Sequence, residues 1–98
     1  MEDYQLMSAT VRIPTPLRKV TNGEDKASVS AGSMDDVVDS LEHQFPGIKD
    51  RICDTDGGLR SFVNVYINGE DIRFIDGMSS TVTSGDEVSI VPAVAGGK

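Results

Sequence analysis

The stretch with the clearest chemical potential is Val91-Pro92-Ala93-Val94-Ala95-Gly96-Gly97, which is followed by Lys98. Pro92 has no N–H, so it cannot donate a hydrogen bond to a sheet ladder. Ala95 has almost no side chain and the two glycines have none, so this stretch can bury little apolar surface. We expect residues 92–98 to form a thin, flexible tail that could thread a narrow channel. A glycine pair alone is equally typical of any flexible chain end.

A second possible chemistry is nucleophilic catalysis by Cys53. The chain has one cysteine and one histidine, Cys53 and His43, which stand ten positions apart. A Cys–His pair is conceivable, but a lone cysteine is more often a plain buried or loop thiol, and His43 lies off the apolar stripe of its segment. With no second cysteine nearby, a zinc site is not indicated. We expect no catalytic residue and no metal ligand here.

A third candidate is the acidic stretch Asp54-Thr55-Asp56-Gly57-Gly58, which has the D-x-D-G look of a calcium loop. Such a loop needs a bidentate glutamate at its twelfth position, and the twelfth residue counted from Asp54 is Val65. The sequence therefore predicts a turn at this place and no calcium site.

The charge balance limits the partners. Sixteen acidic residues against nine basic ones give a formal net charge of −7. This disfavours nucleic acid and anionic membranes, which require a positive surface, and it favours docking onto basic partner proteins. Solubility alone would explain the charge equally well. A single cysteine, no long apolar run and a start without signal-peptide features predict a cytoplasmic protein.

The first half of the chain predicts a hairpin and a helix. Residues 8–13 and 26–30 alternate between polar and apolar side chains, as half-buried strands do. Ser33 is a suitable N-cap for a helix that Pro46-Gly47 ends. The helix has one apolar stripe, which consists of Met34, Val37, Val38, Leu41 and Phe45. We expect this stripe to face the sheet.

The second half predicts another hairpin and a last strand. Residues 62–67 are rich in β-branched and aromatic side chains, Asn68-Gly69 favours a type I′ turn, and residues 71–74 are expected to return as a short strand. Residues 87–91 form the final strand, which we place beside the first. This order indicates an α+β chain of the β-grasp type, a mixed sheet wrapping one helix. The expected division is a flexible extension over 1–7, the domain over 8–91 and the tail over 92–98.

With these elements in place, the chain resembles the ubiquitin-like sulfur carriers of bacteria, which include the small subunit of molybdopterin synthase and the thiamine sulfur carrier. The resemblance covers roughly residues 8–97. Three blocks carry it in order: Ile13-Pro14-Thr15-Pro16-Leu17-Arg18, the stretch Phe62-Val63-Asn64-Val65-Tyr66-Ile67-Asn68-Gly69-Glu70-Asp71-Ile72-Arg73-Phe74, and Val91 to Gly97. The first two look closest to the branch that supplies sulfide to a cysteine synthase.

The resemblance implies a reaction at Gly97. In the family, a ubiquitin-activating-type enzyme adenylates the terminal carboxylate with ATP and magnesium, and a sulfurtransferase activity converts it to a thiocarboxylate. The adenylate supplies a leaving group, and the thiocarboxylate is then a nucleophilic sulfur. Gly96 would keep the entrance to the partner's closed site free, and residues 92–95, Pro92, Ala93, Val94 and Ala95, would thread it. The chain would be a carrier, not an enzyme, and would bind no cofactor itself.

Lys98 departs from the usual ending of the family, because it leaves Gly97 as an amide. Some members of the group have short tails that a JAMM-type zinc metallopeptidase trims, so we rank removal of Lys98 first. Addition of Lys98 during preparation ranks second, and a chain that does not carry sulfur ranks last. The leading function is a sulfur donor to a pyridoxal-phosphate cysteine synthase acting on O-phosphoserine-derived aminoacrylate. The alternatives are the small subunit of molybdopterin synthase, and a protein modifier or interaction module.

Overall fold

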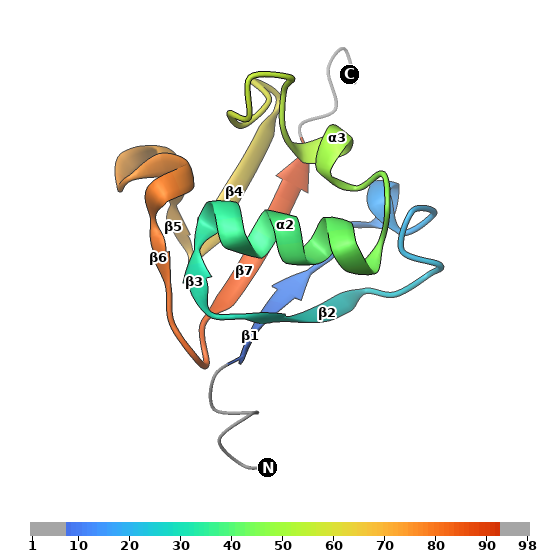
Figure 1. Cartoon of the computed structure of the whole chain (residues 1–98), viewed down its shortest axis with the longest axis horizontal. Coiled ribbons are helices and arrows are strands. Elements are labelled where there is room, and N and C mark those ends of the chain that lie inside the picture. Colours follow the sequence, from blue (N-terminus) through green and yellow to red (C-terminus); the bar gives the residue numbers. More distant parts are fainter. Residues whose placement is uncertain (1–7, 93–98) are drawn as a thin grey trace.

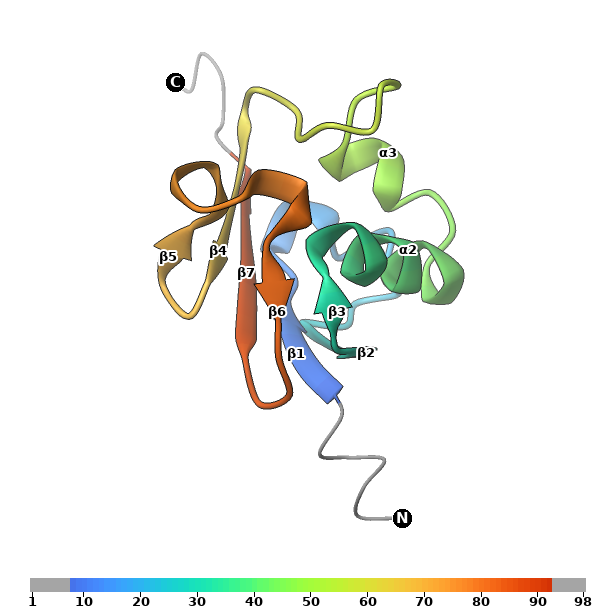
Figure 2. The ribbon, with the colours of Figure 1, turned by 60° about the vertical axis from the view of Figure 1, so that its left-hand side comes forward.

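Five strands form one mixed sheet in the order β2-β1-β7-β4-β5, and helix α2 crosses one face of it (Figure 1). The computed structural model describes residues 8–92. Figure 2 shows that the two helices, α2 (Met34–Gln44) and α3 (Lys49–Ile52), lie on the same side of the sheet. The fold is therefore the expected α+β arrangement of the β-grasp type.

The first hairpin forms as the alternation predicts. Strand β1 (Ser8–Arg12) pairs antiparallel with β2 (Lys26–Ser30), with Val11 opposite Ala27. Ala27 and Val29 are buried, and the other three residues of β2, Lys26, Ser28 and Ser30, are exposed. A short 3-10 turn, η1 (Thr15–Leu17), follows Pro14 and places Leu17 in the core. The sequence pattern did not predict this turn.

Helix α2 begins where Ser33 caps it. The Ser33 hydroxyl accepts a hydrogen bond from the Asp36 N–H at 3.2 Å, and the Asp36 carboxylate accepts one from the Ser33 N–H at 3.1 Å. This reciprocal capping box satisfies two backbone donors that a helix start leaves free. Four residues of the predicted stripe are fully buried, and Phe45 packs partly buried against the core. The predicted facing of helix and sheet is confirmed by the burial of Val11, Ile13, Val37, Val38, Leu41, Val63, Val65 and Ile90.

Strand β4 (Val63–Ile67) forms as predicted, but its return strand is shorter than expected. Asn68 and Gly69 both have positive φ, 52° and 87°, as a type I′ turn requires. The return strand β5 contains only Glu70–Asp71, and residues Ile72–Phe74 form a 3-10 turn, η2. The return strand was predicted correctly at Asp71 but wrongly over 72–74, where the Asp71 carboxylate accepts a hydrogen bond from the Arg73 N–H at 2.8 Å and turns the backbone.

The remaining elements connect η2 to the last strand. They are η3 (Gly77–Ser79), β6 (Thr81–Val82) and β7 (Glu87–Pro92). Strand β6 pairs with β3 (Gly32–Ser33) in a separate two-stranded sheet, which the sequence pattern did not predict because two residues show no periodicity. Pro92, expected as the first residue of the tail, is instead the last residue of β7. Among residues 8–92, no helix has the length and apolar character that a membrane crossing requires.

Candidate functional site

The end of β7 is the point from which the predicted tail continues. Strand β7 lies between β1, to which it is parallel, and β4, to which it is antiparallel. Val88 and Ile90 hold it in the core, and Pro92 stands opposite Val63. Any residue after Pro92 is therefore attached to a central strand that neighbours fix on both sides.

Of the predicted site residues, the structure describes Pro92. Ala93, Val94, Ala95, Gly96, Gly97 and Lys98 lie outside the described residues, as does the predicted extension over 1–7. The roles assigned to the glycines, to the threading residues and to Lys98 consequently stay predictions. What the structure adds is the surface at which the tail begins.

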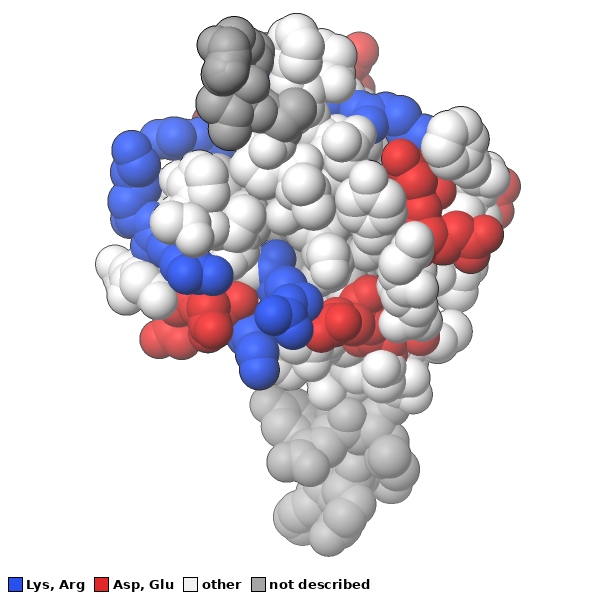
Figure 3. Space-filling view, turned by 180° about the vertical axis from the view of Figure 1, so that it is seen from behind, with Lys and Arg blue, Asp and Glu red and all other residues white. Residues whose placement is uncertain are grey.

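This surface is the outer face of the sheet, which no helix covers. Directly paired residues in an antiparallel sheet share a face, so Val91 and its partner Asn64 both lie outside, as do Ser89 and Tyr66. Val91 is 44% exposed, and Phe62, just before β4, is 62% exposed. Figure 3 shows an uncharged central area on this face, with basic side chains at its left, upper right and lower borders and acidic side chains at its right and below it. The alternation of β4 already contained a signal for this face, since Phe62, Asn64 and Tyr66 alternate with the buried residues.

Cys53 is a core thiol. It follows α3, is 5% exposed, and burial is the main cause that raises its pKa, although nearby Lys49 acts in the opposite direction. His43 is exposed on α2, and no hydrogen bond joins the two side chains in the described part of the chain. A raised thiol pKa disfavours the thiolate that a nucleophile requires. The arrangement supports the reading of Cys53 as a structural residue.

The acidic stretch after Cys53 is a turn, as predicted. The Asp54 N–H donates to the Gly58 carbonyl at 2.8 Å, and the Asp56 carboxylate accepts from the Gly58 N–H at 2.9 Å. Val65, which stands where a calcium loop needs its glutamate, is fully buried in β4. Among residues 8–92 no group of three or more His, Cys, Asp or Glu side chains is placed to hold a metal ion.

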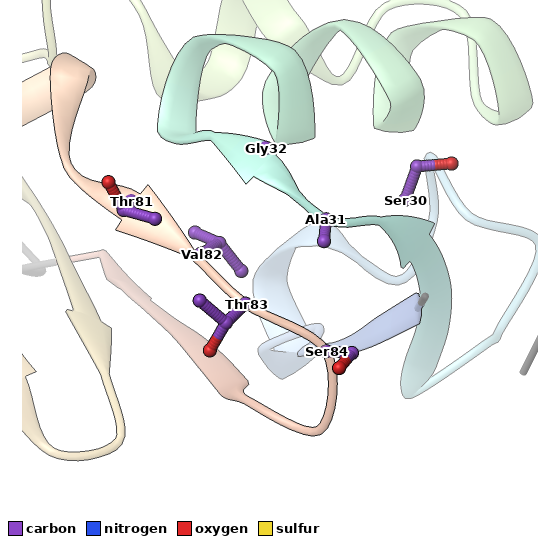
Figure 4. A pocket seen from close by; sticks show the side chains of 7 residues that line it. All are labelled: Ser30, Ala31, Gly32, Thr81, Val82, Thr83 and Ser84. Atoms are coloured by element: carbon purple, nitrogen blue, oxygen red, sulfur yellow. The ribbon is translucent and has the colours of Figure 1, made fainter. Parts of the chain in front are cut away.

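A hollow lies near the beginning of β7. It measures about 480 Å³ and is lined by Ser30, Ala31 and Gly32 on one side and by Thr81, Val82, Thr83 and Ser84 on the other (Figure 4). Its lining has no ionisable side chain. Because it lies beside the turn that enters β7, it is at the opposite end of that strand from Pro92.

Comparison with known proteins agrees with the geometry. The ThiS family profile matches residues 11–97. The sulfur carrier protein CysO of Mycobacterium tuberculosis is 44% identical over 93 residues, which cover 93% of this chain and all of the relative. Small archaeal modifier protein 3 of Haloferax volcanii is 40% identical over 65 residues, 66% of this chain and 70% of the relative.

Solved structures give the same picture. A chain of the Amycolatopsis orientalis BexX/CysO complex superposes with a TM-score of 0.86 at 42% identity and covers 91% of this chain and 99% of its own length. The crystal structure of Mycobacterium tuberculosis CysO gives a TM-score of 0.83 at 42% identity, over 88% of this chain and 99% of that one. The match of sequence over nearly the whole length and the β-grasp topology together show that this chain belongs to the ThiS family of ubiquitin-like sulfur carriers.

Proposed function

We propose that this protein carries sulfur as a thiocarboxylate on Gly97 and donates it to a pyridoxal-phosphate cysteine synthase. The observation that carries the proposal is the 44% identity to the sulfur carrier protein CysO over all of that relative's length. The end of the central strand β7 at Pro92 supports it, because the residues that follow Pro92 in the sequence start from an edge of the folded domain. The solved structure of the Amycolatopsis orientalis BexX/CysO complex gives a precedent for a similar protein bound to another protein.

The chemistry begins with a free carboxylate on Gly97. Lys98 follows Gly97, so hydrolysis of the peptide bond between them must come first, and a JAMM-type zinc metallopeptidase is the proposed agent. The carboxylate oxygen then attacks the α-phosphate of ATP, bound with magnesium on the activating enzyme, and pyrophosphate leaves. A sulfur nucleophile attacks the acyl carbon, the C–S bond forms and AMP leaves with the electron pair of the broken C–O bond.

The chain's own part in this sequence is to present its terminus. Cys53, the one cysteine of the sequence, is buried. The proposal assigns catalysis, ATP and magnesium to the activating enzyme and assigns no cofactor to the carrier. Two glycines suit this task because a side chain would obstruct a closed site.

The test is intact-mass spectrometry of two forms, one ending at Gly97 and one retaining Lys98. Each is incubated with the host's activating enzyme, ATP, magnesium and a sulfur source. The form ending at Gly97 should form the acyl adenylate and then gain the mass of one sulfur-for-oxygen exchange, whereas the longer form should stay unchanged. Thiocarboxylation of the longer form at Lys98 would contradict the trimming step, and an unreactive shorter form would contradict the carrier role.

A second candidate function is protein modification. It is favoured by the 40% identity to small archaeal modifier protein 3 over 65 residues. A modifier would use the same activated Gly97, but a lysine amine would attack the acyl carbon in place of sulfur. Mass spectrometry of host proteins after proteolysis distinguishes the two, because a modifier leaves its terminal residues on substrate lysines and a dedicated sulfur carrier leaves none.

A further inference from the structure

The hollow near the beginning of β7 is lined by short side chains. On the β2 side these are Ser30, Ala31 and Gly32, and on the β6 side Thr81, Val82, Thr83 and Ser84 (Figure 4). The hollow has a volume of about 480 Å³ and reaches Val82, a core residue that is 1% exposed. The Thr83 hydroxyl already donates a hydrogen bond to the Asp86 carboxylate at 2.9 Å. An apolar side chain placed in the hollow would therefore leave that hydroxyl satisfied and remove carbon surface from water.

The chain enters the folded domain beside this hollow. Ser8, the first residue of β1, pairs with Ser30, which lines one wall. The Ser8 carbonyl accepts a hydrogen bond from the Gly85 N–H at 2.9 Å, and Gly85 follows Ser84, which lines the opposite wall. Seven residues of the sequence precede Ser8. Because consecutive Cα atoms are about 3.8 Å apart, the segment 1–7 joins the domain at the rim of the hollow.

The alternation of β1 gives Met7 the phase of the core. Ala9 and Val11 are 2% and 0% exposed, whereas Thr10 between them is not buried. Successive side chains of a strand point to opposite faces of the sheet. Counted back from Ala9, Met7 falls on the buried face and Leu6 on the outer face.

The register between β1 and β2 points to the same residue. Ser8 stands opposite Ser30 in this antiparallel ladder. One further pair would place Met7 opposite Ala31, which lines the hollow. Directly paired residues share a face of the sheet. A methionine suits this place, because its unbranched thioether chain adapts to irregular gaps.

We propose that β1 extends to Met7 and that the Met7 side chain fills the hollow, opposite Ala31. The occupant of the hollow is thus this chain's own N-terminal segment, and neither a second copy nor a partner protein. Met7 becomes part of the folded domain, whereas the sequence predicted a flexible extension over 1–7. The inference does not depend on the proposed function, because the hollow lies at the opposite end of β7 from Pro92.

Oxidation of the methionines tests this inference without any substitution. Hydrogen peroxide transfers one oxygen atom to the sulfur of an accessible methionine, which gives the sulfoxide and water. In the folded chain Met7 should react about tenfold more slowly than in the same chain unfolded in urea, whereas Met1 should react equally fast in both. Tandem mass spectrometry of the tryptic peptide 1–12 follows the two residues separately. Equal rates for Met7 in the folded and the unfolded chain overturn the inference.

Two substitutions in β2 and the link after it test whether this hollow is the protecting site. Ala31→Leu places a larger side chain in the hollow and should raise the rate of Met7 oxidation in the folded chain to nearly that of Met1. Ser28→Leu, at an exposed position of β2 outside the hollow, is the matched control and should leave Met7 protected. Thermal melts verify that both variants are folded. Unchanged protection of Met7 in Ala31→Leu overturns the assignment to this hollow.

Stability tests the phase of the segment. Met7→Ala should lower the melting temperature by about 4–8 °C, as expected when a domain of this size loses a buried side chain. Leu6→Ala, one residue out of phase, should shift it by less than about 2 °C. An equal or larger loss for Leu6→Ala overturns the proposed register.

Dilution identifies the molecule that supplies the methionine. An intramolecular contact does not depend on protein concentration, so protection of Met7 should be the same after about hundredfold dilution. Protection that disappears on dilution would show that a second copy fills the hollow, and it would overturn the inference.

Discussion

Charged side chains have different kinds of partner on the helix side of the sheet, where α2 and α3 lie, and at the end of β7. On the helix side, carboxylates are engaged by their own chain: Asp36 completes the capping box of α2, and Glu42 accepts hydrogen bonds from the backbone N–H groups of Gly47 and Lys49. Asp39 pairs with the Lys49 ammonium at 2.9 Å. Beside the end of β7, by contrast, the Arg73 guanidinium is held by neutral oxygens, those of the Asn64 side chain and the Arg60 carbonyl, and keeps its charge.

This difference shows that the net charge of the chain does not predict which charged groups are paired in either region. The acidic side chains of the helix side have a structural task, because they satisfy backbone donors that would otherwise be free at the start of α2 and of α3. The Arg73 guanidinium stands beside the last residues of β7, on the face of the sheet opposite α2 and α3. We expect changes on the helix side to alter stability and changes at the end of β7 and in the tail to alter activation.

The largest effect is expected at the terminus. Gly97→Val, in the form ending at residue 97, should abolish adenylation and thiocarboxylation while the melting temperature stays unchanged, because a branched side chain does not fit a site shaped for glycine. Intact mass reports the reaction and circular dichroism the melt. Ala93→Val, the same kind of change farther from the reacting carboxylate, should reduce adenylation and thiocarboxylation less. A lower melting temperature for Gly97→Val would contradict the expectation that changes in the tail alter activation and not stability.

The next largest effect is expected on the helix side, and it is a loss of stability. Leu41 is fully buried in α2, so Leu41→Ala should lower the free energy of unfolding by about 2–5 kcal/mol. Chemical denaturation measures this loss. At temperatures where the variant is folded, its adenylation by the activating enzyme should equal that of the unsubstituted chain. An unchanged denaturation midpoint would show that the apolar stripe does not support the sheet.

Much of the fold could be predicted from the sequence, because its main elements have strong local signals. The alternation of residues 26–30, the stripe from Met34 to Leu41 and the Asn68-Gly69 turn each determined an element that the structure contains. The two-residue pairing of β3 with β6 and the turn after Asp71 could not be predicted, since each depends on contacts between distant segments or on one side-chain hydrogen bond.

The candidate site was predictable only in part. The Gly96-Gly97 pair is visible in the sequence, but the placement of Arg73 beside Asn64 and the end of β7 depends on the turn after Asp71 and on the pairing of β4 with β7. Arg18 also depends on the 3-10 turn after Pro14, which brings its side chain back to the Ile13 carbonyl. The adjacency of the first and last strands was predicted, but no pattern in the sequence indicated the side-chain contacts of Arg18 and Arg73.

A smaller effect is expected at the start of α2. Ser33→Ala removes the hydroxyl that accepts the Asp36 N–H, and such a cap contributes about 0.5–2 kcal/mol. Urea denaturation should show a loss in this range. Ser40→Ala, at a partly buried position within α2, is the control and should cost less. Equal losses for both would indicate that general packing, and not the cap, stabilises this end of the helix.

The smallest effect depends on pH. Hydrogen bonds from the backbone N–H of Lys49, at 2.9 Å, and of Gly47 hold the pKa of Glu42 below its ordinary value. A carboxyl whose pKa is lower in the folded state adds stability that is present above its unfolded pKa, about 4.3, and is lost as the pH falls through the folded value. Glu42→Gln should therefore be less stable at pH 7, and the difference should shrink in acid.

Denaturation midpoints of both proteins between pH 7 and pH 3 measure this difference. Glu24→Gln, which removes an exposed carboxylate whose side chain has no hydrogen bond in the described part of the chain, should give midpoints that follow the unsubstituted protein at every pH. Because Glu42 lies on the helix side, Glu42→Gln should also leave the Kd for the activating enzyme unchanged. If the difference in denaturation midpoint between Glu42→Gln and the unsubstituted protein stays constant down to pH 3, the carboxylate charge is not what stabilises this turn. An altered Kd would show that the two regions are coupled.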